Sequence, residues 1–367
     1  MIEFFILFAG LFLAYVNGAN DNFKGVATLF GSGASDFKRA LYWATLTTFL
    51  GSLTALFLSK GLVAAFSGKG LVSDSLTKMP VFLLSVALGS ALTVCLATVT
   101  GFPISTTHAL VGGLVGAGIA SGQSVHFKTL SSSYFLPLLF SPVISVFLTR
   151  VIHPVFQYIC RICAVNGETC LCIDGKDEIV EFAPGGSAVL KSTRLALTVD
   201  QVSVCETRYK GRFLGISAQE VLDRAHYLTA GAVGFARGLN DTPKLVALLI
   251  AAQLLNIHNA IPLAGIAIAL GGLLNARKVA QTMSRKITPM NHGQGFTANL
   301  VSAFLVTVAS FLSLPVSTTH VTCGSIVGIG LVSGKTKWGV VRNIGLAWLT
   351  TLPLSAFLSA MIFHMSK

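Results

Sequence analysis

The stretch PISTTHALVGGLVGAG, residues 103–118, occurs a second time in slightly altered form as PVSTTHVTCGSIVGIG, residues 315–330. The two copies align without a gap, and both contain Pro-x-Ser-Thr-Thr-His followed by three glycines in register. A second pair of segments, NGANDNFKGVA (17–27) and RGLNDTPKLVA (237–247), precedes the first pair in the same order. Because two motifs recur in one order and at similar separations, the chain is interpreted as a duplicated unit.

The composition of the 367 residues places this duplicated unit in a membrane. Hydrophobic residues make up 53% of the chain and charged residues only 11%, whereas a soluble domain carries roughly 25% charged residues. Apolar runs long enough for a helical span recur at both ends of the chain, and we expect about ten to twelve spans or half-spans. The sequence therefore predicts a multi-pass integral protein, located in the plasma (inner) membrane. Its first apolar run is interpreted as a membrane helix rather than a removable signal peptide.

Three parts follow from the distribution of hydrophobic residues. Residues 1–157 and 218–367 are the two transmembrane repeats, and residues 158–217 are a mixed, polar insert. The predicted fold is an all-α polytopic membrane protein of two repeated helical units with broken helices, plus a small β-rich central soluble domain. Inverted repeats are frequent in secondary transporters, so we expect the two units to have opposite orientations. Ordinary spans are expected at residues 40–59, 80–99, 260–276 and 297–314.

The Pro-x-Ser-Thr-Thr-His element predicts an anion site. Proline followed by hydroxyl side chains is typical of a helix start, and the hydroxyls cap free backbone N–H groups. Hydroxyls, N–H groups and the positive end of the helix dipole would then converge on a tetrahedral oxyanion. The alternative is two capped helices whose glycines serve packing alone. His108 and His320 either bond a neighbour or relay protons. The candidate anion ligands are Ser105, Thr106, Thr107, Ser317, Thr318 and Thr319.

Asp21 and Asp241 are carboxylates in otherwise apolar spans. A charged side chain at the bilayer centre costs at least ~2.5–3.5 kcal/mol on insertion scales, so each needs a polar surrounding and a partner. One interpretation is a purely structural ion pair with Lys24 or Lys244, each three positions further along one helical face.

The other interpretation assigns the acids to a coupling cation. Each Asn-Asp pair, formed with Asn20 or Asn240, would break its helix and offer oxygens to the ion. A bare carboxylate repels an anionic substrate, so a bound Na⁺ or proton must neutralise it. Each ligand then binds better when the other is present.

These elements resemble a known family. GANDNFKG (18–25), GLNDTPK (238–244) and the two P-x-STTH elements are similar to the duplicated signatures of the inorganic phosphate transporter (PiT) family. The resemblance implies two inverted halves, a homodimer, and transport of inorganic phosphate with a co-transported cation, without enzymatic activity or a cofactor. It also implies that Asn20, Asp21, Asn240 and Asp241 serve the cation and phosphate site, and that the two Ser-Thr-Thr turns bind phosphate oxygens.

The chain departs from this family pattern beside each aspartate. Many sodium-coupled members continue the Asn-Asp pair with Val-Ala-Asn, whereas here Asn22-Phe23-Lys24 and Thr242-Pro243-Lys244 follow. A fixed positive charge at Lys24 and Lys244 favours protons, or a differently built site, over Na⁺. The alternatives are a sulfate permease of the same fold and an anion channel. A membrane enzyme is disfavoured because no nucleophile–base set or complete metal site is evident.

The excess of basic residues indicates lipid rather than nucleic acid as a partner. The formal net charge of +12 is scattered among hydrophobic spans, which argues against nucleic-acid binding. Basic loops on the cytoplasmic side face anionic lipid. The clearest such loop is ARKVAQTMSRK, residues 276–286.

The central insert contains five of the seven cysteines. CRICAVNGETCLC gives a CxxC and a CxC, and cysteines at such spacing could bind zinc, although no second CxxC or histidine pair completes the pattern. Redox sensing and ordinary reduced thiols are the alternatives. Alternating stretches downstream predict β-strands. The candidate metal ligands are Cys160, Cys163, Cys170 and Cys172.

Overall fold

The structure is a computed structural model that divides into two compact units. The larger unit comprises Met1–His153 and His226–Lys367, and the smaller comprises Pro154–Ala225. The structure describes residues 2–58, 60–68, 70–182, 188–201, 215–312 and 314–366.

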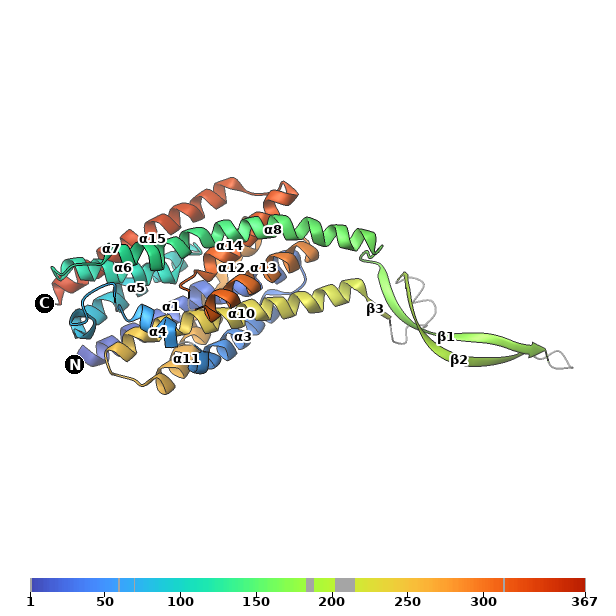
Figure 1. The fold of residues 1–367 in the computed structure, drawn as a ribbon, viewed down its shortest axis with the longest axis horizontal. Helices are drawn as coiled ribbons and strands as arrows, with labels where there is room; N and C mark the ends of the chain where they lie inside the picture. Colours follow the sequence, from blue (N-terminus) through green and yellow to red (C-terminus); the bar gives the residue numbers. More distant parts are fainter. Residues whose placement is uncertain are drawn as a thin grey trace. The chain divides into compact units, whose positions relative to one another are not determined.

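The helices of the first repeat follow the expected order (Figure 1). A long first segment is followed by a second helix, a short connecting region, a helical hairpin and a closing helix. Their bounds are α1 (Ile2–Asp21), η1 (Asn22–Val26), α2 (Ala27–Ser32), α3 (Phe37–Leu58), α4 (Lys60–Phe66), η2 (Leu76–Lys78), α5 (Pro80–Thr100), α6 (Thr106–Ala120), α7 (Phe127–Thr129), η3 (Leu130–Phe135) and α8 (Leu136–Ile162).

The second repeat has a corresponding series of helices (Figure 1). It again begins with a long helix that carries the Asn-Asp pair, and it ends with a short helix and a closing helix. The bounds are α10 (Ala218–Ala251), α11 (Ile257–Asn275), α12 (Arg277–Gln281), η4 (Thr282–Lys286), α13 (His292–Phe311), α14 (Thr318–Ser333) and α15 (Trp338–Met365).

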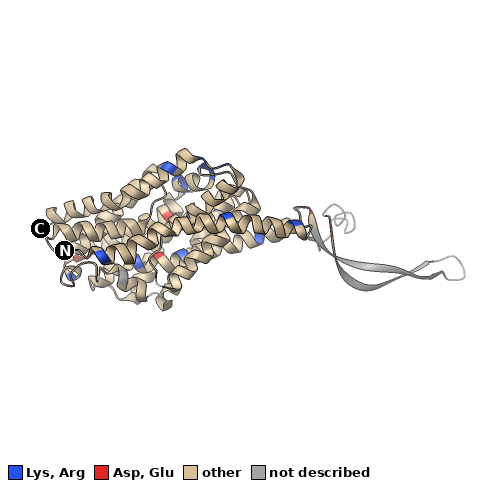
Figure 2. Cartoon of the chain, turned by 45° about the horizontal axis from the view of Figure 1, so that its top comes forward, with Lys and Arg blue, Asp and Glu red and all other residues tan. Residues whose placement is uncertain are grey.

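Seven helices of the described chain are long and apolar enough to cross a membrane, and α6 and α14 are shorter apolar helices. The four ordinary spans predicted from the sequence coincide with α3, α5, α11 and α13, each of which is among the seven. Figure 2 shows how sparse the charged residues are along these helices. The prediction of a multi-pass integral membrane protein is therefore confirmed.

Corresponding helices of the two repeats run antiparallel where they meet. Gly10, in the middle of α1, packs against Leu249 near the end of α10. Gly25, beyond the end of α1, packs against Gly234 in the middle of α10. The residue numbers rise along one segment while they fall along the other, so the two opening helices have opposite directions.

The glycines of the repeated motif allow the short helices to pack closely on the closing helix of the other repeat. A methyl group at Gly116 of α6 would lie 2.0 Å from the carbonyl oxygen of Ala356 in α15. At Gly328 of α14, it would lie 2.9 Å from the carbonyl oxygen of Val146 in α8. Small residues permit such approach in membrane helices. The two repeats thereby exchange helices and form one bundle.

The expected helix break is present in the first repeat and absent in the second. α1 ends at Asp21, and a 3-10 segment, η1, carries Asn22–Val26. α10 instead continues without interruption from Ala218 to Ala251, with Pro243 inside it. The prediction of a break at Asn240-Asp241 is therefore wrong. Proline fixes φ near the helical value and removes one local hydrogen bond, which neighbouring helices in a membrane bundle tolerate.

The smaller unit does not support a small β-rich domain. Its strands are β1 (Thr169–Phe182), β2 (Ala188–Gln201) and the three-residue β3 (Gly215–Ser217), in the antiparallel order β2-β1-β3. Within the described residues, this is one long hairpin with a brief third strand. The two alternating stretches pair with each other and do not form two layers around a core. Residues 183–187 and 202–214, where further strands could be expected, lie outside the described residues.

Candidate functional site

The four motifs of the two repeats meet at a buried polar cluster inside the larger unit. Its charged side chains are almost inaccessible to solvent: Asp21 is 2% exposed, Asp241 5%, and Lys24, Lys244 and Arg237 1% each. Ions removed from water need close partners and additional hydrogen bonds. The contacts of each carboxylate therefore define the site.

The carboxylate of Asp21 has three kinds of partner. One oxygen forms an ion pair with the ammonium of Lys24. The other accepts hydrogen bonds from Asn17 Nδ2 at 3.0 Å and from the hydroxyl of Thr106 at 3.2 Å. Thr106 belongs to the Ser-Thr-Thr turn of the same repeat, so the predicted acid and the predicted anion-binding turn are in direct contact.

Asp241 has the equivalent surroundings in the second repeat. Its Oδ1 lies 3.4 Å from Lys244 Nζ, and its Oδ2 accepts from the hydroxyl of Thr318, also at 3.4 Å. Arg237 adds a second cationic contact, with Nε 3.6 Å from Oδ2. The structural ion pairs considered from the sequence are thus present in both repeats, with a further cation in the second.

Each lysine also reaches the hydroxyl turn of the other repeat. Lys24 Nζ donates to Thr319, and Lys244 Nζ donates to Thr107 at 3.1 Å. Each lysine additionally donates at 2.9 Å to a backbone carbonyl of its own repeat, Ile104 for Lys24 and the aligned Val316 for Lys244. The two halves are therefore connected by a pair of crossed ammonium–hydroxyl contacts.

The predicted helix starts are confirmed at both Ser-Thr-Thr turns. Ser105 precedes α6 and its hydroxyl accepts from the backbone N–H of His108 at 3.2 Å. Ser317 precedes α14 and accepts from the N–H of His320 at 3.3 Å. A helix start has four backbone N–H groups without intrahelical acceptors, and one serine accounts for only one of them. The remaining donors are suited to an anion.

The two helix tips lie next to each other rather than facing lipid. The ring centroids of His108 and His320 are 4.7 Å apart, and the hydroxyl of Thr319 donates to the carbonyl of Ile104 at 2.7 Å. His320 also donates from Nδ1 to the carbonyl of Leu138, 3.1 Å away. The anion-site prediction requires the two helix starts to lie together at one central position. The observed geometry agrees with that requirement.

The two asparagines differ in how their amide oxygens are used. Asn20 Oδ1 accepts from Lys24 Nζ at 3.1 Å and from the backbone N–H of Ile104 at 3.2 Å. Asn240 directs its amide nitrogen to Asp241 and to the carbonyl of Val316. Its buried Oδ1 has no hydrogen-bond partner among the described residues. Because both neighbours of the nitrogen are acceptors, the amide orientation is determined, and the oxygen is an unused acceptor.

Arg237 is the functional candidate that the motif comparison missed. Its guanidinium donates to Asn17 Oδ1 at 2.7 Å and to Asn22 Oδ1 at 3.3 Å, so it connects α10 to the first motif. The alignment of NGAND with RGLND already placed Arg237 opposite Asn17. A positively charged residue at this aligned position of a buried motif was the signal that could have identified it.

The charges of the cluster do not cancel. Counted at their formal charges, Lys24, Lys244 and Arg237 contribute three positive charges and Asp21 and Asp241 two negative charges, which leaves one positive charge. A buried excess charge is expensive unless a counter-ion joins it. The cluster therefore has the electrostatic character of an anion site.

The predicted cysteine site is not tested by the structure. Cys160 is half-buried and Cys163 exposed, and both are free thiols. The side chains of Cys170 and Cys172 lie outside the described residues. Within the part of the chain that is described, no group of three His, Cys, Asp or Glu side chains is arranged to hold a metal ion.

Comparison with known proteins agrees with the resemblance noted in the sequence. Residues 17–359 match the model of the phosphate transporter family. A protein of Pyrococcus abyssi (strain GE5 / Orsay) with the provisional name of phosphate permease is 27% identical, over 97% of this chain and 96% of its own length. One of Rhizobium meliloti (strain 1021), provisionally named a low-affinity inorganic phosphate transporter, is 28% identical, over 98% and 94%.

A solved structure has the same fold. The sodium-dependent phosphate transporter superposes with a TM-score of 0.76 at 24% identity, covering 100% of this chain and 98% of its own. These relatives are transporters and permeases, so the prediction that the chain is not an enzyme is confirmed. They are named for phosphate, and neither the sulfate nor the channel alternative is favoured.

Proposed function

Because the chain belongs to the phosphate transporter family, we propose that it carries inorganic phosphate across the membrane in symport with a cation, and that this cation is the proton. The observation that carries the proposal is the pair of crossed contacts, Lys24 with Thr319 and Lys244 with Thr107. They join two helix starts, two carboxylates and an excess positive charge at one buried position.

Phosphate binds between the tips of α6 and α14 in this proposal. The backbone N–H groups of the first helical turns and the threonine hydroxyls donate to its oxygens, as at other helix N-termini. Ser105 and Ser317 hold the turns in place as helix caps. Lys24, Lys244 and Arg237 supply the positive charge. The ligand set is Ser105, Thr106, Thr107, Ser317, Thr318, Thr319, Asn20 and Asn240.

Protons fit the surroundings of the carboxylates better than Na⁺. The ammonium of Lys24 already occupies a cage of oxygens from Asn20, Asp21, Ile104 and Thr319, which is the kind of cage a hard metal cation requires. Lys244 occupies a similar position beside Asp241. With these positions filled by fixed cations, a proton is the cation that either carboxylate can still take up.

Competition for the ammonium groups then couples the two ligands. Asp21 and phosphate both attract Lys24, and Asp241 and phosphate both attract Lys244. A proton on either carboxylate cancels its charge and releases the lysine to the anion. Each ligand therefore binds more tightly when the other is present, and the coupling is reciprocal.

Alternating access requires the two halves to move relative to each other while the ligands stay between them. The antiparallel opening helices and the exchange of α6 and α14 between closing helices support an inverted-repeat arrangement of this kind. The side chains of the central cluster are at most 5% exposed. We assign this geometry to the occluded stage of the transport cycle.

Asn240 provides a reason for phosphate to be preferred over sulfate. Phosphate retains a P–OH group near neutral pH, whereas sulfate is fully ionised and has no proton to donate. The unused Oδ1 of Asn240 can accept only from an anion that carries such a proton. A site that includes a buried acceptor rejects a ligand that leaves it unpaired.

The test is uptake of labelled phosphate into proteoliposomes of purified protein. An inward proton gradient should drive accumulation above equilibrium, and an equal sodium gradient without a proton gradient should not. Sulfate should compete poorly. Accumulation that follows the sodium gradient alone would refute proton coupling but leave phosphate transport standing, whereas flux without accumulation under any gradient would indicate a channel.

A further inference from the structure

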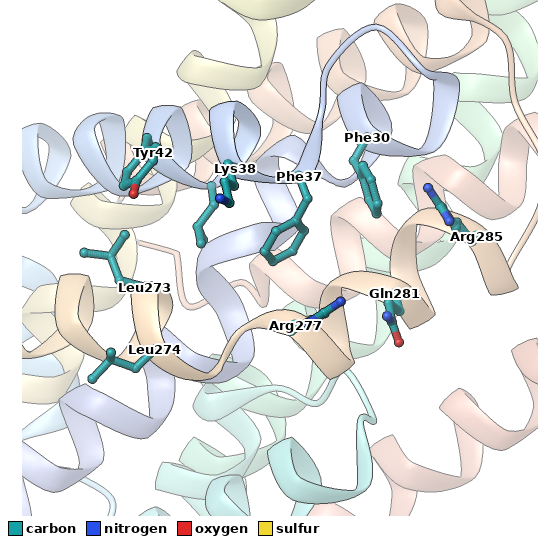
Figure 3. A pocket seen from close by; sticks show the side chains of 10 residues that line it. Phe30, Phe37, Lys38, Tyr42, Leu273, Leu274, Arg277, Gln281 and Arg285 are labelled. Atoms are coloured by element: carbon teal, nitrogen blue, oxygen red, sulfur yellow. The ribbon is translucent and has the colours of Figure 1, made fainter.

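We propose that a groove on the surface of the larger unit binds one anionic phospholipid. The groove has a volume of about 720 Å³ and lies between α2 and α3 on one wall and the end of α11, α12 and η4 on the other. In Figure 3, Phe30, Phe37 and Lys38 come from the first wall, and Arg277, Gln281 and Arg285 from the second. None of these residues belongs to the transport site.

One end of the groove is cationic. Lys38, Arg277 and Arg285 line it, no acidic side chain is among its described lining residues, and no ion pair in the described chain involves these three cations. The guanidinium of Arg285 lies 4.4 Å from the ring centroid of Phe30, which holds it over the groove. A guanidinium group can donate two parallel hydrogen bonds to two oxygens of one phosphate, so this end matches the phosphodiester of a lipid headgroup.

The other end of the groove is apolar and continues into a second depression. Tyr42 and Leu273 line both, and the second, of about 380 Å³, runs on between α3 and α11 past Phe49 and Ile266. From Phe37 to Phe49 an α-helix extends about 18 Å. Exposed hydrocarbon side chains line the second depression, with Leu46 51% and Leu270 49% exposed. A basic mouth followed by an apolar trough has the shape and polarity of a headgroup with one acyl chain.

The position of the groove in the membrane fits an anionic headgroup. Two of the three cations, Arg277 and Arg285, belong to the basic segment 276–286, which was predicted as a loop but forms α12 and η4, and the positive-inside rule places this segment on the cytoplasmic side. Anionic phospholipids are concentrated in that leaflet, and basic pockets between membrane helices there are suited to them. Free inorganic phosphate shares the headgroup chemistry, but it would leave the apolar trough unused. We therefore assign the site to lipid.

The experiment compares lipid retention by the full-length wild type and two variants, using native mass spectrometry and thermal denaturation in detergent. The probes are dioleoylphosphatidylglycerol, dioleoylphosphatidylcholine and inorganic phosphate, each added alone. The first variant, Lys38→Gln/Arg277→Gln/Arg285→Gln, removes the cationic end. Its matched control removes three exposed basic side chains that do not line the groove, Arg39→Gln/Lys286→Gln/Lys335→Gln.

We expect the wild type and the control to retain one phosphatidylglycerol and to be stabilised by it, and the first variant to bind it at least tenfold more weakly. Ala269→Trp, which fills the trough and keeps the cations, should also lose retention. Equal retention by wild type and first variant, or equal effects of the two lipids, would overturn the proposal. So would stabilisation by inorganic phosphate that the first variant abolishes, or a change of oligomeric state showing that a second copy covers the groove.

Discussion

The ammonium of Lys244 lies 3.1 Å from the hydroxyl of Thr107, a residue of the other repeat. Lys24 makes the equivalent contact with Thr319, so each half of the molecule contacts the Ser-Thr-Thr turn of the other half. Neither contact exists within an isolated repeat. The site therefore depends on the relative position of the halves, which changes during the proposed alternating-access cycle.

Removal of the crossed hydroxyls should weaken phosphate binding. Thr107→Val and Thr319→Val keep the shape of the side chain but remove a hydroxyl that donates to phosphate in the proposed site, so the bound anion loses a hydrogen bond worth about 1–3 kcal/mol. We expect the half-saturation concentration for phosphate uptake to rise roughly 5- to 150-fold. Thr100→Val, on an exposed part of α5, is the control. Unchanged half-saturation in both variants would contradict the site assignment.

Asp21→Asn and Asp241→Asn should uncouple transport from the proton gradient. Asparagine resembles the protonated acid, so the ammonium groups stay available to phosphate while no proton is carried. Concentrative uptake should fall to background in each variant, and exchange of internal for external phosphate should persist in part. Measurement of both fluxes in the same proteoliposomes separates loss of coupling from loss of folding. Near-normal accumulation by both variants would rule out a coupling role for the carboxylates.

Lys24→Ala should make the transporter responsive to sodium. The substitution empties the oxygen cage formed by Asn20, Asp21, Ile104 and Thr319, and a hard cation prefers oxygen ligands. We expect phosphate uptake by this variant to be low without Na⁺ and to increase when Na⁺ replaces choline in the buffer. Lys128→Ala, at an exposed position, should behave as wild type. A variant that is inactive at every Na⁺ concentration but correctly folded would argue against the substitution of ammonium for metal.

Asn240→Ala should reduce the preference for phosphate over sulfate. The variant removes the unused acceptor, so phosphate loses a partner that sulfate never had. The ratio of sulfate to phosphate inhibition constants should fall by roughly tenfold, as expected for one hydrogen bond to a buried polar group. Asn20→Ala provides the comparison, because its oxygen is already bonded to Lys24 and Ile104 and both anions should weaken together. An unchanged ratio in Asn240→Ala would exclude the selectivity role.

Gly116→Ala should prevent correct assembly of the helical bundle. The added methyl would lie 2.0 Å from the carbonyl oxygen of Ala356, and neither backbone can yield without separating α6 from α15. Gly345→Ala, in α15, meets nothing within 4 Å and should be neutral or slightly stabilising, by up to about 1 kcal/mol. Monodispersity and thermal denaturation of the two purified variants give the comparison. Normal behaviour of Gly116→Ala would show that the packing of α6 on α15 is looser than described.

Much of this architecture could be predicted because its main motifs occur twice in the sequence. The repeat located both helix starts, both acids and both lysines, and the serine caps at Ser105 and Ser317 follow from local backbone chemistry alone. The ion pairs of Asp21 and Asp241 were also expected from residue spacing. These features depend on neighbours within a few residues.

The remaining features depend on partners that are distant in the sequence. The carbonyls of Ile104 and Val316 bind the lysines through backbone atoms, which no side-chain motif reveals. Arg237 bonds to Asn17 and Asn22 across more than half of the chain. The continuity of α10 through Pro243 could not be anticipated, since packing by surrounding helices decides whether a proline breaks a membrane helix.

The crossed lysines also restrict how the gene for this protein can evolve. After duplication, two copies ordinarily drift apart, each tolerating its own substitutions. Here a change at Lys24 alters the environment of Thr319 in the other copy, so mutations in one half select for compensating mutations in its sister. A chimera that joins one half of this chain to the complementary half of a distant relative would combine residues that do not match at these contacts. The two halves are therefore expected to coevolve.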